Sequence, residues 1–496
     1  MKNLWQNSIS TTPESIQMNK KVLLMLISTL FIGGNAIAAD VEVPQESASP
    51  SVRYAKIQYT AKEFRNSLDS LDKKFMNLNV SAAYQDMAEL IADSENNDYY
   101  LMLLADKATG LGFYDLANRA FSKISDSEIA KLDYENTHKL FFPKYKMTSQ
   151  ELIALSEACS NIEHNDRSAE AIKDILDNIK NIESNDYANY VLAMGYMKLE
   201  DIDNAKKHIQ TAITINPENL NYKILQSQVI ASTKKNRKSL KLVKETKKIN
   251  IGYYPIKKQV DSNEEFIKYK TEKQPWLKDY HLGYYYYLKE DNSKALRILQ
   301  SAISKNNSRN AVLYSLMSRI YIKNGDFEKA NSVATKAYNY NLSNINTLLS
   351  LGDVAYANNK YKQALKYYKK AAQSRSSVTE AKLKLADTYS KLNNTKTSNS
   401  IYQKIVKSDN TAYEAYYHIA LNDPDAELSY LKKSVAINPN FKDGWIDLSR
   451  IMIENGNLAQ AKKYLENAYY IDGNDFRYYY YQSLLLKKTE ELNKIK

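Results

Sequence analysis

Along most of this chain, apolar residues recur among polar ones with the spacing of amphipathic helices. Between residues 280 and 410, apolar residues recur at i, i+3, i+4 and i+7, which places them on one face of a helix. Short polar turns separate these segments, and in one of them Gly325 precedes Asp326. Glycine suits such a turn because it adopts a left-handed backbone conformation without strain. The pattern predicts paired helices that must stack on neighbouring pairs to bury their apolar faces.

Small residues recur with a fixed period at the positions where the paired helices would cross. Ala295, Ala330, Ala364 and Ser398 follow one another at nearly equal steps along the chain. This spacing resembles the tetratricopeptide repeat (TPR), a helix-turn-helix unit of about 34 residues. The resemblance implies an all-α fold, a right-handed α-solenoid of roughly eight to ten TPR-like helix-turn-helix repeats.

Residues 1–38 have the pattern of an export signal. Two lysines precede the apolar run of residues 22–32, and small residues then lead to an A-x-A type site that ends at Ala38. The run is too short to span a bilayer comfortably. We predict a Sec-type signal peptide over residues 1–38, with translation starting at Met1 or Met18. The protein would then be periplasmic or extracellular, with no transmembrane span after cleavage. The alternative is a membrane anchor formed by an uncleaved N-terminal segment.

The remainder of the chain divides by how closely it follows the repeat. Residues 39–54, with two prolines and several Ser and Glu, are predicted to be a flexible linker. Residues 55–231 are predicted to form degenerate TPR-like helical repeats. Residues 276–496 are predicted to form the regular TPR array, and a charged helix from about Asp475 would cap its C-terminal end.

Residues 232–275 interrupt the pattern, and we predict a basic irregular seam there. Eight lysines and arginines fall between residues 234 and 248. They suit a basic patch that binds an anionic surface or polymer. The interpretation that we favour is the second helix of a weak repeat, with a solvated lysine face around Leu240 and Val243, because long lysines commonly cover helix surfaces.

Candidate catalytic chemistry is sparse. Cys159 is the only cysteine, which excludes an intramolecular disulfide, and the five histidines form no metal-binding spacing. We therefore predict no enzyme and no catalytic, metal-binding or cofactor-binding residues. The formal net charge of +12 is spread along the chain without a base-reading module, so we expect no nucleic-acid partner. Anionic envelope lipids or glycans are the more natural partners of this charge.

The resemblance to the TPR family also implies a site. In that family the first helix of each repeat lines a concave groove, and ligands usually contact its second, fifth, ninth and twelfth positions. The same positions in this sequence give the candidate ligand groove, and Tyr286 is expected to face the core instead. The groove residues are Tyr280, Tyr284, Tyr287, Arg319, Tyr356, Tyr417, Arg450 and Tyr480, and Asp353 and Asp387 lie in the same line. The fifth positions lack the paired Lys and Asn that clamp a terminal carboxylate, so we expect no carboxylate clamp.

The abundance of tyrosine bears on what the groove binds. The chain has 41 Tyr against 11 Phe, and we expect most of them to pack between repeats. The groove tyrosines suit protein binding, because Tyr offers a large contact area and a hydroxyl at low entropic cost. We predict a non-enzymatic exported TPR scaffold that mediates protein-protein interactions in the cell envelope. The alternative is a polysaccharide-binding accessory protein of envelope glycan export or assembly, in which flat aromatic faces hold a sugar strand.

Overall fold

The chain divides into two units, Met1–Lys56 and Ile57–Lys496, of which the second is compact. A computed structural model describes residues 61–125, 138, 140–233, 236–249, 252–306, 310–341, 343–374 and 379–495, all of them in the second unit. The predicted signal peptide and linker, residues 1–54, lie outside the described residues. No strand occurs within the described ranges, and no helix there has the length and apolar character needed to cross a membrane.

The first helices of the second unit are α2 (Ala61–Met76), α3 (Val80–Asp93), α4 (Asp98–Leu111), α5 (Tyr114–Phe121), α8 (Ser149–His164), α9 (Ser168–Asn178), a 3-10 turn η1 (Ile182–Ser184), α10 (Asp186–Lys198), α11 (Ile202–Ile215), α12 (Leu220–Ser232) and α13 (Asn236–Lys247). They are followed by α14 (Tyr254–Thr271), α15 (Pro275–Leu288), α16 (Asn292–Asn306), α17 (Ala311–Lys323), α18 (Phe327–Tyr340), α19 (Ile345–Ala357) and α20 (Tyr361–Gln373). The last are α21 (Thr379–Lys391), α22 (Thr395–Ser408), α23 (Tyr413–Asn422), α24 (Glu427–Ile437), α25 (Lys442–Glu454), α26 (Leu458–Ile471) and α27 (Phe476–Ile495).

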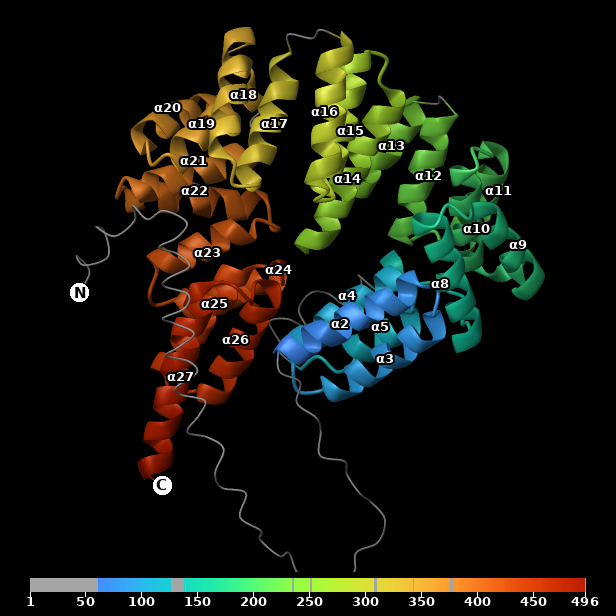
Figure 1. Ribbon diagram of the computed structural model, residues 1–496, viewed down its shortest axis with the longest axis horizontal. Helices are drawn as coiled ribbons and strands as arrows, with labels where there is room; N and C mark the ends of the chain where they lie inside the picture. The colour runs from blue at the N-terminus through green and yellow to red at the C-terminus, as the bar shows by residue number, and fades with distance from the viewer. Residues whose placement is uncertain are drawn as a thin grey trace, which may run out of the picture. The chain divides into compact units, whose positions relative to one another are not determined.

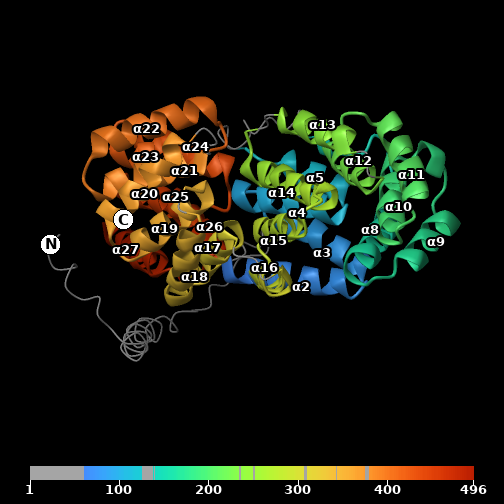
Figure 2. The same ribbon diagram turned by 90° about the horizontal axis from the view of Figure 1, so that it is seen from above.

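Consecutive helices pack as pairs, and each pair packs on the next (Figures 1 and 2). The pairs of the C-terminal half are α15 with α16, α17 with α18, α19 with α20, α21 with α22, α23 with α24, and α25 with α26. This arrangement confirms the predicted all-α solenoid of helix-turn-helix repeats. The long helix α27 follows the last pair, at the place where the sequence predicted a capping helix.

The residues that carry the repeat phase lie where the helices touch. Ala295, Ala330, Ala364 and Ser398 have no exposed surface. At the turn between α17 and α18, Gly325 has a φ of +78°, a left-handed conformation that favours glycine. The following Asp326 caps α18, because its carboxylate accepts a hydrogen bond of 3.1 Å from the amide of Lys329. The local pattern and the packing therefore agree.

The stretch 232–275 is not irregular, which corrects the predicted basic seam. It contains helices α13 and α14, and Val243 is buried while Leu240 is 37% exposed. Acidic residues of α14 compensate the lysines: Lys247 lies 3.3 Å from Asp261, and Lys268 lies 3.2 Å from Glu264. The interpretation as a helix with a solvated lysine face holds.

The two ends of the described array contact each other, which the repeat pattern did not predict. Helix α2 packs on α26, and the guanidinium of Arg65 donates a hydrogen bond of 2.7 Å to the carbonyl of Tyr470 (Figures 1 and 2). Phe64 stacks on Tyr100 of α4 at 3.8 Å between ring centroids and meets the edge of Tyr470 at 5.5 Å. Helices from opposite ends of the described array therefore share one apolar core.

Candidate functional site

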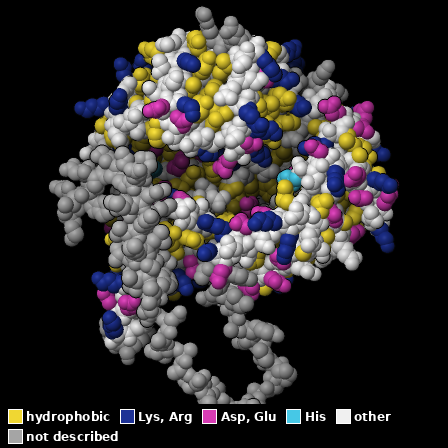
Figure 3. Space-filling view, in the orientation of Figure 1, with side chains coloured by type: hydrophobic (Ala, Val, Ile, Leu, Met, Phe, Trp, Pro, Cys, Tyr) yellow, Lys and Arg dark blue, Asp and Glu magenta, His cyan; other side chains and the backbone are white. Residues whose placement is uncertain are grey.

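The first helices of successive pairs in the C-terminal array form a groove with a pocket at its centre. Helices α15, α17, α19 and α21 line this pocket, which has a volume of about 280 Å³. Three of the predicted groove residues, Tyr287, Arg319 and Tyr356, line it together with the predicted Asp353 and Asp387. Figure 3 shows that one face of the protein is hollowed, with hydrophobic and charged side chains at the rim of the hollow.

A stack of three tyrosines runs along α15 into this pocket. The ring centroids of Tyr280 and Tyr284 are 5.9 Å apart, and those of Tyr284 and Tyr287 are 5.8 Å apart. The guanidinium carbon of Arg319 lies 5.6 Å from the ring centroid of Tyr287, in the range of a cation-π contact. The spacings i, i+4 and i+7 put the three rings on one face of the helix.

The tyrosine stack also belongs to the core. All three rings are half-buried and pack against the apolar cluster that contains Leu299 and Leu313. Burial raises the pKa of Tyr284 to about 12, so its hydroxyl is neutral at physiological pH. The sequence assigned these tyrosines to the groove; all three also pack against the core, and Tyr287 is the one that lines the pocket.

Charged side chains from different repeats pair across the pocket. Arg319 of α17 lies 2.6 Å from Glu380 of α21, and Lys384 of α21 lies 2.8 Å from Asp353 of α19. Burial lowers the pKa of Arg319, but the charge of Glu380 together with those of Asp353 and the neighbouring tyrosines outweighs it, and the pKa lies well above its usual range. The hydroxyl of the buried Tyr368 donates a hydrogen bond of 2.6 Å to Asp353. These pairs hold opposite charges in fixed places on the groove wall.

Glu414 of α23 adds an acid that titrates near neutral pH. Its side chain is exposed, but desolvation by the surrounding protein and the charges of Asp387 and Glu380 together raise its pKa to about 7, against the opposing charge of Lys384. The charge of this part of the groove therefore changes within the physiological range.

Sequence reasoning missed Glu380, Lys384 and Glu414. Glu380 and Glu414 occupy the second position of their helices and stand one repeat period apart, so the same positional rule would have found them. Lys384 stands one residue past the fifth position. It reaches the pocket because its long side chain extends to Asp353, which no positional rule encodes.

We expect the raised pKa of Glu414 to make stability depend on pH. An unfolded glutamate loses its proton near its ordinary value of 4.5, whereas the folded one keeps it up to about 7. The contribution of this group to stability is complete below the unfolded pKa and is lost as pH rises through the folded value. Thermal unfolding from pH 4 to 8 should therefore show a steeper loss of stability in the wild type than in Glu414→Gln.

The exposed acid Glu328 supplies the matched control for this measurement. Glu328→Gln should keep the wild-type pH profile. Parallel profiles for the wild type and Glu414→Gln would show that Glu414 ionises at the same pH in the folded and unfolded states.

The predicted residues Tyr417, Arg450 and Tyr480 lie on α23, α25 and α27. The hydroxyl of Tyr417 donates a hydrogen bond of 2.8 Å to Asp447, which in turn lies 3.7 Å from Arg450. Tyr480 is 63% exposed, and its ring contacts Tyr481 at 5.0 Å. None of Tyr417, Arg450 and Tyr480 lines the pocket of Tyr287 and Arg319. The structure thus divides the predicted groove residues between two places.

Among the described residues, no group of three or more His, Cys, Asp or Glu is placed to hold a metal ion. Burial raises the pKa of the Cys159 thiol well above its usual range, so the thiol stays protonated at neutral pH. A protonated, buried thiol is a poor nucleophile.

Family models of the tetratricopeptide repeat match residues 187–219, 315–379, 349–413 and 418–485. The chain therefore carries tetratricopeptide repeats, as the sequence pattern indicated. A TPR repeat-containing protein of Methanocaldococcus jannaschii is 26% identical over 222 residues, which are 43% of this chain and 36% of that protein. The match spans about a third of the length of this curated relative.

Three solved structures are also similar to this chain, and one of them is described as a TPR protein. YrrB, described as a TPR protein with an unusual peptide-binding site, is 18% identical, with 37% of this chain and 97% of that chain covered and a TM-score of 0.27. The Cut9–Hcn1 hetero-tetramer of the APC/C is 13% identical, with coverages of 86% and 88% and a TM-score of 0.39. MamA is 20% identical, with coverages of 36% and 97% and a TM-score of 0.26.

Proposed function

We propose that this tetratricopeptide-repeat chain is a non-enzymatic scaffold that binds other proteins in the groove of α15, α17, α19 and α21. One observation carries the proposal: side chains from these four helices converge on a single pocket with a tyrosine stack and cross-repeat ion pairs. Solenoids of this kind present extended concave surfaces that suit binding to elongated partners.

The chemistry of the groove favours an extended peptide segment with apolar and charged side chains. The exposed sides of Tyr284 and Tyr287 offer flat apolar surface, which suits anchoring side chains of a partner. The pairs formed by Arg319 and Lys384 with their acids hold both signs of charge in fixed positions. Fixed charges select a complementary partner mainly by rejecting segments that place like charges opposite them.

We also propose that the scaffold acts after export, in the cell envelope. Support comes from the sequence of residues 1–38, where a basic start, an apolar run and a small-residue cleavage pattern follow in order. Cell fractionation and the intact mass of the purified protein test this part separately. Recovery of an unprocessed chain with the cytoplasmic fraction would refute it.

The groove is tested by crosslinking capture from cell extract with the wild type and with Arg319→Ala. We expect the variant to lose a defined protein partner, with affinity reduced roughly 30-fold if Arg319 is a hot spot worth about 2 kcal/mol. Arg297→Ala removes an exposed arginine from α16, the second helix of a neighbouring pair, and should capture the partner as the wild type does. Circular dichroism of all three proteins checks that helicity is unchanged.

Two results would redirect the proposal. Equal capture by wild type and Arg319→Ala would place the binding surface elsewhere. Capture of polysaccharide without any protein would favour the glycan-binding alternative, in which the stacked faces of Tyr284 and Tyr287 hold sugar rings.

A further inference from the structure

A second, larger cavity lies in the N-terminal half, away from the groove. It has a volume of about 490 Å³ and is lined by residues of α4, α5, α8, α10, α12 and α14 and of the segments that precede α8 and α14. This volume falls within the range of small-molecule sites, about 300 to 1,000 Å³. Nothing in the repeat pattern requires such a cavity, because stacked repeats normally fill their interfaces with side chains.

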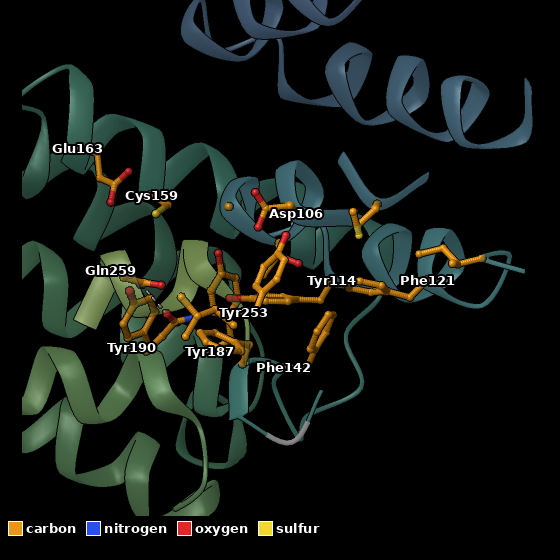
Figure 4. A pocket seen from close by; sticks show the side chains of 17 residues that line it. Asp106, Tyr114, Phe121, Phe142, Cys159, Glu163, Tyr187, Tyr190, Tyr253 and Gln259 are labelled. Atoms are coloured by element: carbon orange, nitrogen blue, oxygen red, sulfur yellow. Dashed lines mark hydrogen bonds between the residues drawn. The ribbon is translucent and has the colours of Figure 1, made fainter. Parts of the chain in front are cut away.

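The walls of the cavity are aromatic. Tyr114 and Tyr187 meet edge to face at 4.9 Å, and Tyr187 stacks on Tyr190 at 6.1 Å between ring centroids. Tyr114 also meets the edge of Phe142 at 5.4 Å. Tyr114 and Tyr187 are buried, so the packing of the core holds their rings in place. Figure 4 shows the rings of Tyr187, Tyr190 and Tyr253 grouped together in the cavity.

The charges of the cavity are all negative. Asp106 on α4 and Glu163 on α8 are its acidic residues, and no Lys or Arg is found among the described residues that line it (Figure 4). This is unusual in a chain with a net charge of +12. Both carboxylates are exposed within the cavity, where a ligand can reach them. Desolvation by the surrounding protein raises the pKa of Asp106, although the charge of Lys107 opposes the shift. Lys107 itself is engaged, at 2.6 Å from Asp72.

Glu163 has two basic neighbours, but neither lines the cavity. His164 lies 3.8 Å from Glu163. The charge of Glu163 also offsets part of the lowering of the pKa of Lys289, the residue that follows α15, by burial. On the cavity wall, burial raises the pKa of the Cys159 thiol, and the charge of Glu163 adds to this shift. Both bases lie outside the lining of this cavity, so they leave its interior acidic.

We propose that this cavity binds an organic cation, an ammonium or guanidinium group carried on an apolar body. Aromatic faces attract such cations through the ring quadrupole, and Asp106 supplies the counter-charge. An anion would meet two carboxylates without a base, and a neutral ligand would gain no attraction from Asp106. The cation has two possible sources, a free small molecule or a basic side chain of a peptide, and both present the same chemistry to the tyrosines.

Calorimetric titration of the full chain with matched probes tests the proposal. Choline is compared with its neutral isostere 3,3-dimethylbutan-1-ol, and the capped tripeptide Phe-Lys-Phe with its norleucine counterpart. We expect at least one cation to bind about tenfold more tightly than its neutral match, as a partly desolvated cation-π contact predicts. Preference for choline identifies a free cation as the ligand, and preference for the lysine peptide identifies a basic side chain.

Asp106→Asn, which keeps the size of the side chain, should abolish this preference. Asp203→Asn on α11 removes an exposed carboxylate of the same kind and should leave it intact. Equal affinity for each cation and its neutral match in the wild type, or binding of neither cation, overturns the proposal. An unchanged preference in Asp106→Asn overturns the role of the carboxylate. Arg319→Ala is expected to bind the probes normally, so failure here and failure of the groove proposal are distinguishable.

Discussion

Gly352→Ala is expected to lower the free energy of unfolding by about 1 to 3 kcal/mol, because the added methyl group collides with a buried ring. A Cβ on Gly352 would lie 2.7 Å from Cδ1 and 2.8 Å from Cζ of Tyr368. Carbon atoms in favourable contact are about 3.5 to 4.0 Å apart. Tyr368 is 2% exposed, packs in the core between α19 and α20 and is tied to Asp353 by its hydroxyl, so displacing the ring costs packing contacts and strains that hydrogen bond. Equilibrium denaturation in urea measures the loss.

The same substitution should weaken binding in the groove, although Gly352 does not line it. The Tyr368 hydroxyl donates to Asp353, and Asp353 in turn pairs with Lys384. A displaced ring would leave Asp353 with one partner fewer and would release Lys384 from its fixed position. Capture of the groove partner by Gly352→Ala, measured at a temperature where the variant is folded, is expected to fall below that of the wild type.

Gly110→Ala is the matched control for this prediction. Gly110 is also helical, but a Cβ there would meet nothing within 4 Å. Alanine favours a helix over glycine by up to about 1 kcal/mol, so this variant should be as stable as the wild type or more stable. Equal losses for the two variants would mean that the contact of Gly352 with Tyr368 does not limit stability.

The repeat phase predicted the residues at which paired helices cross, because it is a local and periodic signal. Ala295, Ala330 and Ala364 could be identified from spacing alone, and all three are fully buried. The same phase predicted Tyr287 and Arg319 on one groove wall, where the structure brings them together. Position within a repeat is enough for such residues, since each first helix presents the same face to the groove.

Other features depend on information that the phase does not contain. The pairing of Lys247 with Asp261 could not be predicted from the repeat pattern, because the acid lies on the next helix. The contact of Arg65 with Tyr470 joins residues 405 positions apart. It depends on small rotations between repeats that accumulate along the whole array, and these rotations are not written in any single repeat.

Trp445→Ala is expected to lower the free energy of unfolding by about 3 to 5 kcal/mol. Trp445 on α25 is 1% exposed, and its indole donates a hydrogen bond of 2.8 Å to the carbonyl of Pro439. Its ring meets Tyr99 of α4 at 5.0 Å and Tyr464 of α26 at 5.5 Å. Truncation would therefore leave a cavity at the place where the first and last helices of the described array share a core.

The position of the cavity left by Trp445→Ala determines which helices should lose protection from amide hydrogen exchange. In an open solenoid each repeat is stabilised by its neighbours alone, so a defect in α25 would lower the protection of α24 to α27 only. Here Trp445 touches Tyr99, so amide hydrogen exchange should accelerate in α4 and in α2 as well.

Trp276→Ala is the control, because Trp276 of α15 packs within the cluster of Leu299 and Leu313, and its loss should leave α2 and α4 protected. Unchanged exchange in α2 and α4 of Trp445→Ala would show that the two ends touch without stabilising each other, because a contact that contributes to stability must transmit its loss to both partners.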